Sequence, residues 1–276
     1  METLLATARS SVGSSINLPY SRYMTSNHTD FRIAYVLHNN ILQMLKARPF
    51  SNGLPQHWPT AFDATRTETG LDLDTHLGRE VAITSANVNI LLCLAAYTES
   101  DLEEILLAAF PHGQERAEFD DRAVSILRSE LIKLSSLERY FDFFQKLYGK
   151  HPRELLCDQT KTGVRLLFDL RNIVIHASAL AGQWHCKDGQ HYLMVDDPFY
   201  LSVVRTSAKL LGLPDTFYCL PESLLGCNQL IDILIQCAGD AISILSRYVV
   251  EHWPDCKIAF HLPHLVIDAL KYKASL

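Results

Sequence analysis

The sequence predicts a mainly α-helical protein, a bundle of helices that carries one short β-hairpin. Three observations support this fold class. From residue 81 onward, apolar residues recur at helical spacing in several long segments. Between these segments stand capping residues, glycines and prolines, which start and stop helices. A single stretch, GQWHCKDGQHYLMVDDP, places an Asp-Gly turn signal between strand-like flanks.

Length and composition are those of a soluble globular protein. The chain has 276 residues, of which 48% are hydrophobic and 20% charged, enough for a sizeable core. The formal net charge of −6 argues against a broad surface that coats nucleic acid, although it leaves room for a small basic cleft. Seven cysteines without a CxxC pair indicate reduced thiols, and METLLATARS lacks the features of a signal peptide. We therefore expect a cytoplasmic protein.

The start of the chain predicts an arm, one helix and a long loop. Residues 1–30 are rich in Ser and Thr and show little apolar periodicity. Helical spacing begins at Phe31 and ends before Pro49, and the prolines and glycines that follow indicate a long connection. The predicted division is into an N-terminal segment, a helical domain and a C-terminal extension, at residues 1–80, 81–252 and 253–276.

Three long helices are predicted between residue 81 and the hairpin. Ser85 caps the first, which extends to about Phe110. The second runs from about Phe119 to Tyr148 and stops at Gly149. The third spans about residues 162–177.

Two further helices follow the hairpin. Asp197-Pro198 is typical of an N-cap followed by a proline in the first helical position, and this helix ends near Gly212. The last helix spans about Glu222 to Val250 and contains a long apolar stretch, LIDILIQCAGDAISIL. That stretch holds a polar stripe of Asp232, Gln236 and Asp240. We therefore interpret it as a core helix and expect no contact with a membrane.

The third helix carries several polar residues inside an apolar run, FDLRNIVIHASA. Because residues three, four or seven apart share a helix face, one continuous polar stripe is formed by Arg165, Asp169, Asn172 and His176. Arg171 lies off this stripe by roughly a third of a turn, but its side chain is long enough to swing partly back. An arginine side chain can bind a phosphate, and a histidine side chain can give a proton to it or take one from it.

The segment RNIVIHA resembles the signature of the HEPN superfamily, in which an arginine and a polar residue precede a histidine several residues on. Arg171, Asn172 and His176 match these positions. Upstream, NILLCLAAYTESDLEEIL is similar to the family's long early helix with an embedded acid, and SLERYFDFFQKLYGKHP is similar to its aromatic-rich helix. The resemblance covers about residues 81–250 and departs at Ala177-Ser178-Ala179, where many members carry Asn or Gly.

The resemblance implies a HEPN-like helical bundle and a metal-independent endoribonuclease of toxin or phage-defence type, with RNA as substrate and no cofactor. It implies a homodimer in which two motif helices meet and form one composite cleft. His176 would move protons, Arg171 would stabilise the charge that builds on phosphorus, and Asn172 would orient the histidine or a phosphate oxygen. An inhibitory protein partner would fit a toxin of this type.

Two acids are candidates for supporting roles, Glu99 and Asp169. Glu99 lies at the edge of an apolar helix face, where it could hold Arg171 or polarise His176. A solvated pair with Glu103, one turn on, is the alternative for this acid. Arg171 could instead pair structurally with an acid such as Asp169, and His176 could bond a carbonyl at the helix end.

A second class of function is a non-catalytic HEPN-like module that dimerises or binds another protein. The acidic net charge favours this class. The intact Arg171, Asn172 and His176 favour the ribonuclease, since a scaffold has no need of all three. The aromatic residues between Tyr140 and Phe144 are interpreted as core side chains and not as a platform for stacking bases.

Two groups of cysteine and histidine residues have spacings that zinc tolerates. They are Cys256, His261 and His264 near the C-terminus, and His185, Cys186 and His191 around the hairpin. Neither group supplies four clear ligands, which structural zinc sites usually need. We therefore predict no metal site.

Overall fold

The computed structural model describes the helices, the two strands and the loops that join several of them. The described residues are 28–48, 73–108, 136–176, 182–187, 190–195, 197–219, 221–253, 265, 266 and 268. The described helices are α2 (His28–Ala47), α3 (Leu73–Leu107), α5 (Leu137–Tyr148), α6 (Pro152–Leu155), α7 (Asp158–Ile175), α8 (Pro198–Leu211), α9 (Pro221–Leu225) and α10 (Asn228–His252). The prediction of a mainly α-helical fold holds.

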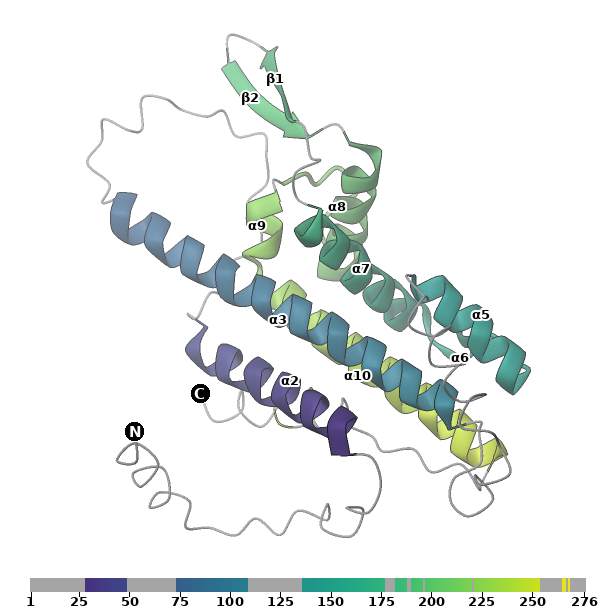
Figure 1. Cartoon of the computed structure of the whole chain (residues 1–276). Coiled ribbons are helices and arrows are strands. Elements are labelled where there is room, and N and C mark those ends of the chain that lie inside the picture. The colour runs from purple at the N-terminus through teal and green to yellow at the C-terminus, as the bar shows by residue number, and fades with distance from the viewer. Residues whose placement is uncertain are drawn as a thin grey trace, which may run out of the picture.

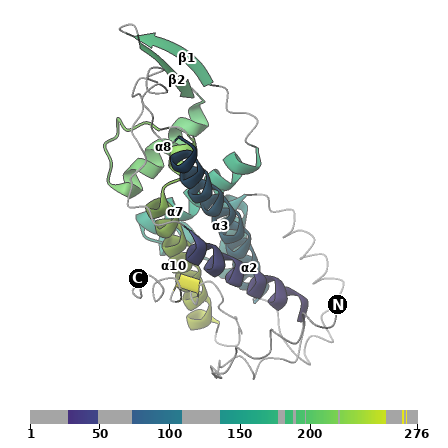
Figure 2. The same ribbon diagram turned by 90° about the vertical axis from the view of Figure 1, so that its left-hand side faces the viewer.

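The two longest helices, α3 and α10, run side by side along the molecule, as Figures 1 and 2 show. The N-terminal helix α2 packs on α3, and α7 packs on α10. Helix α8 packs on α7, and α5 lies against α3. Helix α7, which carries the motif residues, is thereby held between α10, α3 and α8.

Helix α10 supplies much of the core. Leu230, Leu234 and Leu245 are fully buried within it. By length and composition alone this helix could cross a membrane, but 56% of its most apolar window is buried inside the structure. On its exposed face, the Gln236 amide donates to Asp240 one turn later in the same helix, at 2.8 Å. The buried leucines place α10 in the core of the described structure, and the absence of contact with a membrane stays a prediction.

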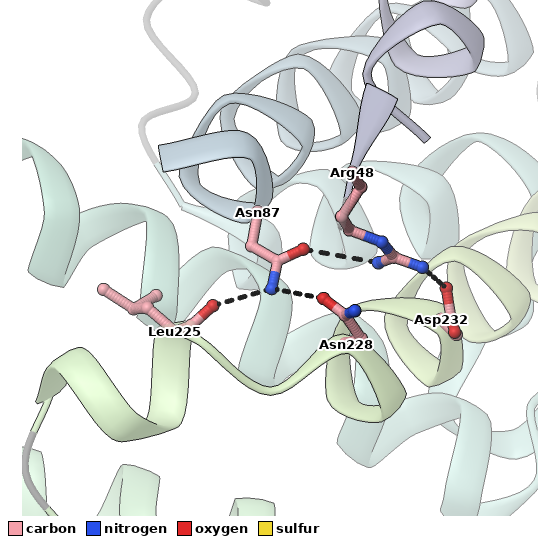
Figure 3. A network of polar contacts seen from close by, with 5 residues as sticks. All are labelled: Arg48, Asn87, Leu225, Asn228 and Asp232. Atoms are coloured by element: carbon pink, nitrogen blue, oxygen red, sulfur yellow. Dashed lines mark hydrogen bonds and ion pairs between the residues drawn. The ribbon is translucent and has the colours of Figure 1, made fainter. Parts of the chain in front are cut away.

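The break between α9 and α10 is where the predicted single helix over residues 222–250 is wrong. Asn87 of α3 donates its side-chain amide to the Leu225 carbonyl and to Oδ1 of Asn228, both at 3.0 Å (Figure 3). The first bond occupies a carbonyl at the end of α9 that a continuous helix would use internally. The interruption therefore combines a local signal, Gly226 directly after α9, with a contact from a distant helix.

The same network fastens α2 to the rest of the fold. Arg48, directly after α2, donates to Oδ1 of Asn87 at 3.3 Å and to Oδ1 of Asp232 at 2.9 Å (Figure 3). Ile41 and Leu45 of α2 join the same buried cluster as α3 and α10. The predicted boundary at residue 80 falls inside α3.

Two predicted helix starts differ from the structure. Helix α3 begins at Leu73, before the predicted cap at Ser85. Ser136 has an extended backbone, with φ of −140° and ψ of 146°, so α5 starts at Leu137 and the predicted helix over residues 119–148 is interrupted there. The predicted stop at Gly149 is confirmed, because that glycine has a left-handed φ of 74°.

The motif helix α7 begins at Asp158, four residues before its predicted start. Gly163, in the second turn of this helix, lies against α10. A Cβ atom at Gly163 would lie 2.4 Å from Sγ of Cys237 on α10, so only glycine allows this close approach of the two helices.

The strands β1 (Gly182–Lys187) and β2 (Gln190–Val195) pair antiparallel, with Cys186 opposite His191. They project from the end of the molecule near α8 (Figures 1 and 2). The predicted turn at residues 188–189 lies outside the described residues. The predicted start of α8 is confirmed, because the Asp197 side chain accepts the Tyr200 N–H at 2.8 Å.

Candidate functional site

The motif residues occupy the C-terminal end of α7. The opposite face of this helix anchors it in the core through Leu166, Leu167 and Leu170, each at most 1% exposed. The helix ends at Ile175, and the His176 N–H still bonds the Asn172 carbonyl at 2.9 Å. Asn172 and His176 therefore sit on the last turn, where the packed helix fixes their backbone.

Arg171 forms an ion pair with Glu99 of α3. The distance between Nη1 and Oε1 is 3.2 Å, and the two side chains are 25% and 22% exposed. Burial raises the pKa of Glu99, and the negative charge of Glu103 raises it further, while Arg171 pulls it down. The sequence left three roles open for Glu99: holding Arg171, polarising His176, or forming a solvated pair with Glu103. In the structure Glu99 holds Arg171.

A small pocket of about 150 Å³ lies between α7 and the start of α5. Its lining includes three residues of the predicted polar stripe, Arg165, Asp169 and Asn172, and also Arg171. The α5 side contributes Ser136, Leu137 and Glu138. Arg171, which helix geometry placed off the stripe, thus reaches the same pocket as the stripe does.

Asp169 pairs within its own helix and not with Arg171. Its Oδ2 lies 3.8 Å from Nε of Arg165, four residues earlier. Burial raises the pKa of Asp169, and Glu138 adds to this rise, whereas Arg165 opposes it. The structural alternative of an Asp169–Arg171 pair is therefore not what the structure contains.

His176 is exposed and lies outside the residues that line the pocket. Within the described part of the chain its side chain forms no hydrogen bond or ion pair, and its backbone, not its ring, satisfies the helix end. The neighbouring Ile175 is 54% exposed. The end of α7 thus presents a histidine and an apolar side chain to the outside.

Sequence reasoning missed one member of this charged group, Tyr140 of α5. Its ring is 3% exposed, which confirms its interpretation as a core side chain. Its hydroxyl, however, donates to Oε1 of Glu103 at 3.1 Å. Tyr140 is the one residue of the aromatic run with a hydroxyl, but the local sequence does not name the partner of that hydroxyl, because the contact is made to another helix.

No group of three metal-ligating side chains occurs among the described residues. His185, Cys186 and His191 lie on the strands, of which the backbone alone is described. Cys256, His261 and His264 lie outside the described residues.

Comparison with known proteins adds no information on this site. No protein-family model, curated protein or solved structure matches this chain. The likeness to the HEPN superfamily is therefore a hypothesis based on the motif residues and their surroundings.

Proposed function

We propose that this protein is a HEPN-type endoribonuclease that cleaves RNA without a metal ion. The observation that carries the proposal is the pocket beside the motif, in which Arg171 and Asn172 lie next to each other while Glu99 holds the arginine. An ion pair of this kind also stabilises folds. A structural pair, however, does not need a hollow beside it that is lined by a second arginine, Arg165.

Arg171 is suited to bind the phosphate that is cut. A guanidinium presents five N–H donors in a planar fork, and Glu99 engages Nη1. The other donors are directed to a phosphate and stabilise the charge that builds on it in the transition state. The Asn172 amide supplies one more donor and acceptor at the same pocket.

His176 is proposed to move the protons. The ribose 2′-oxygen attacks phosphorus while a neutral histidine takes the proton of the 2′-hydroxyl. The bond from phosphorus to the 5′-oxygen breaks, and a charged histidine protonates that oxygen. The products are a 2′,3′-cyclic phosphate and a 5′-hydroxyl.

One chain offers a single histidine in the motif, whereas this reaction uses one acid and one base. We infer a homodimer in which the ends of two α7 helices meet. The exposed Ile175 beside His176 supports this arrangement, because burial of that side chain would stabilise the contact. A cytoplasmic toxin or phage-defence enzyme, held in check by an inhibitory protein, is the matching biological setting.

The test is RNA cleavage in EDTA by the wild type and by His176→Ala and Arg171→Ala. Both substitutions are expected to abolish cleavage. The far-UV circular dichroism spectrum below the melting transition should stay unchanged in both, whereas Arg171→Ala should also lower Tm because it leaves Glu99 without its cation. His252→Ala is the matched control, since His252 is another exposed histidine on the last turn of a helix. RNA with 2′-O-methyl groups should resist cleavage, and the products should carry 5′-hydroxyl ends. Wild-type activity in both motif variants would leave the non-catalytic module as the better account.

A further inference from the structure

Two polar contacts on neighbouring turns of α3 connect that helix to α5 and to α7. Tyr140 of α5 donates to Glu103 at 3.1 Å, and Glu103 lies one turn after Glu99 on α3. Glu99 in turn pairs with Arg171 of α7 at 3.2 Å. Glu103 and Glu99 thus lie between the Tyr140 hydroxyl and the Arg171 guanidinium, which is proposed to bind phosphate.

The two acids on α3 have different partners: Glu99 pairs with Arg171, and Glu103 accepts from Tyr140. Glu99 and Glu103 are four residues apart on the same helix, so their charges repel each other. Both charges act on Tyr140, and so does Arg171, which shows that the four groups lie within electrostatic reach of one another. If Glu103 moved to Arg171, it would occupy donors that a phosphate needs, because a guanidinium binds carboxylate and phosphate through the same fork.

We propose that Tyr140 is a positioning residue for Arg171: its hydroxyl holds Glu103 in place, so that Glu99 is the only one of these two acids on the guanidinium. This inference rests on the proposed function, since it concerns the same site. It assigns a functional role to a side chain that is otherwise part of the core.

The hydroxyl is suited to this role because it remains protonated. Burial raises the pKa of Tyr140, and the negative charges of Glu103 and Glu99 raise it further. The group therefore stays an O–H donor throughout the working range of pH. Its ring is buried and packed independently of the hydroxyl, so Tyr140→Phe removes the donor and keeps the packing.

The experiment compares wild type, Tyr140→Phe, Glu103→Gln and the double variant in steady-state cleavage of RNA. Tyr140→Phe is expected to lower kcat about tenfold, which corresponds to about 1.4 kcal/mol of transition-state stabilisation. Adding Glu103→Gln to Tyr140→Phe should bring kcat back to within about threefold of wild type, because the competing charge is gone. A purely structural role would give no such rescue.

The matched control is Tyr248→Phe, which removes another tyrosine hydroxyl, one that bonds the Tyr148 carbonyl at 3.5 Å. It should leave kcat unchanged. Wild-type kcat in Tyr140→Phe, or a double variant no more active than Tyr140→Phe, would overturn the proposal.

A second readout separates this proposal from the proposed function. The Nε–Hε signal of Arg171, assigned by its loss in Arg171→Lys, reports the setting of the guanidinium without any RNA. It should shift in Tyr140→Phe and return in the double variant. If wild type cleaves no RNA, the ribonuclease proposal fails, while the signal still decides whether Tyr140 positions Arg171. An unmoved signal in Tyr140→Phe would refute the positioning role.

Discussion

Replacing Arg48 with methionine tests how firmly α2 belongs to the fold. The Arg48 side chain is 8% exposed and donates to both Asn87 and Asp232. Methionine keeps the apolar stem of the side chain and removes both bonds. Asn87 then loses one hydrogen bond, and the Asp232 carboxylate, which is 20% exposed, loses its ion pair.

The expected loss of unfolding free energy lies between the values measured for exposed ion pairs and those for buried ion pairs. An exposed ion pair contributes about 0.2–1 kcal/mol, and removing one partner of a buried pair costs about 3–5 kcal/mol. Because Asp232 keeps some contact with water, we expect Arg48→Met to lower the free energy of unfolding by about 2–4 kcal/mol. For a chain of this size that is a fall in Tm of roughly 5–15 °C.

Urea and thermal unfolding of full-length protein measure this loss, and a double-mutant cycle with Asp232→Asn isolates the pair. The coupling energy should be about 1–3 kcal/mol. If α2 were an independent segment, Arg48→Met would change Tm by less than about 2 °C, and such a result would refute the reasoning.

Three other changes have defined outcomes. Ile175→Asp should be a monomer by light scattering and should not cleave RNA. Val36→Asp, at an equally exposed apolar position on α2, should remain a dimer and should still cleave RNA. An active monomeric Ile175→Asp would refute the dimer. Burial raises the pKa of Glu99 above 4.5, so at pH values just above 4.5 the folded chain binds more protons than the unfolded chain. Stability should therefore rise as the pH falls toward 4.5, and Glu99→Gln should flatten this part of the plot of Tm against pH. An unchanged slope in Glu99→Gln would contradict the raised pKa. Gly163→Ala should lower the free energy of unfolding, measured in urea, by about 1–2 kcal/mol, because overpacking against Cys237 outweighs the gain in helix propensity. A higher free energy of unfolding in this variant would contradict that argument.

Local signals in the sequence predict the parts of this fold that depend on neighbouring residues. The Asp197 cap and the stop at Gly149 are confirmed because both bond within their own turn. Helical spacing likewise predicts a polar stripe of which three residues, Arg165, Asp169 and Asn172, line the pocket, whereas the fourth, His176, lies outside it. The break before Asn228 was missed: Gly226 is the local signal for it, and the Asn87 amide from another helix, which bonds the Leu225 carbonyl there, has no signature in the local sequence.

The candidate site shows the same division. The motif names Arg171 and Asn172, but the acid that holds the arginine lies on α3 and the tyrosine behind that acid on α5. The sequence offered Glu99 as one of several partners and gave no reason to single out Tyr140. Which of these side chains meet is decided by how α3, α5 and α7 pack, and apolar periodicity carries no information on such pairings.

The Arg171–Glu99 pair makes function and stability depend on each other, so a second substitution is needed to separate them. Arg171→Ala leaves a half-buried Glu99 without its cation, and part of any lost cleavage would then come from a weakened fold. Glu99→Gln removes that charge. We therefore expect Arg171→Ala/Glu99→Gln to recover at least half of the Tm lost by Arg171→Ala, while cleavage stays absent because no guanidinium faces the phosphate. Recovery of cleavage together with Tm would show that Arg171 serves the fold alone.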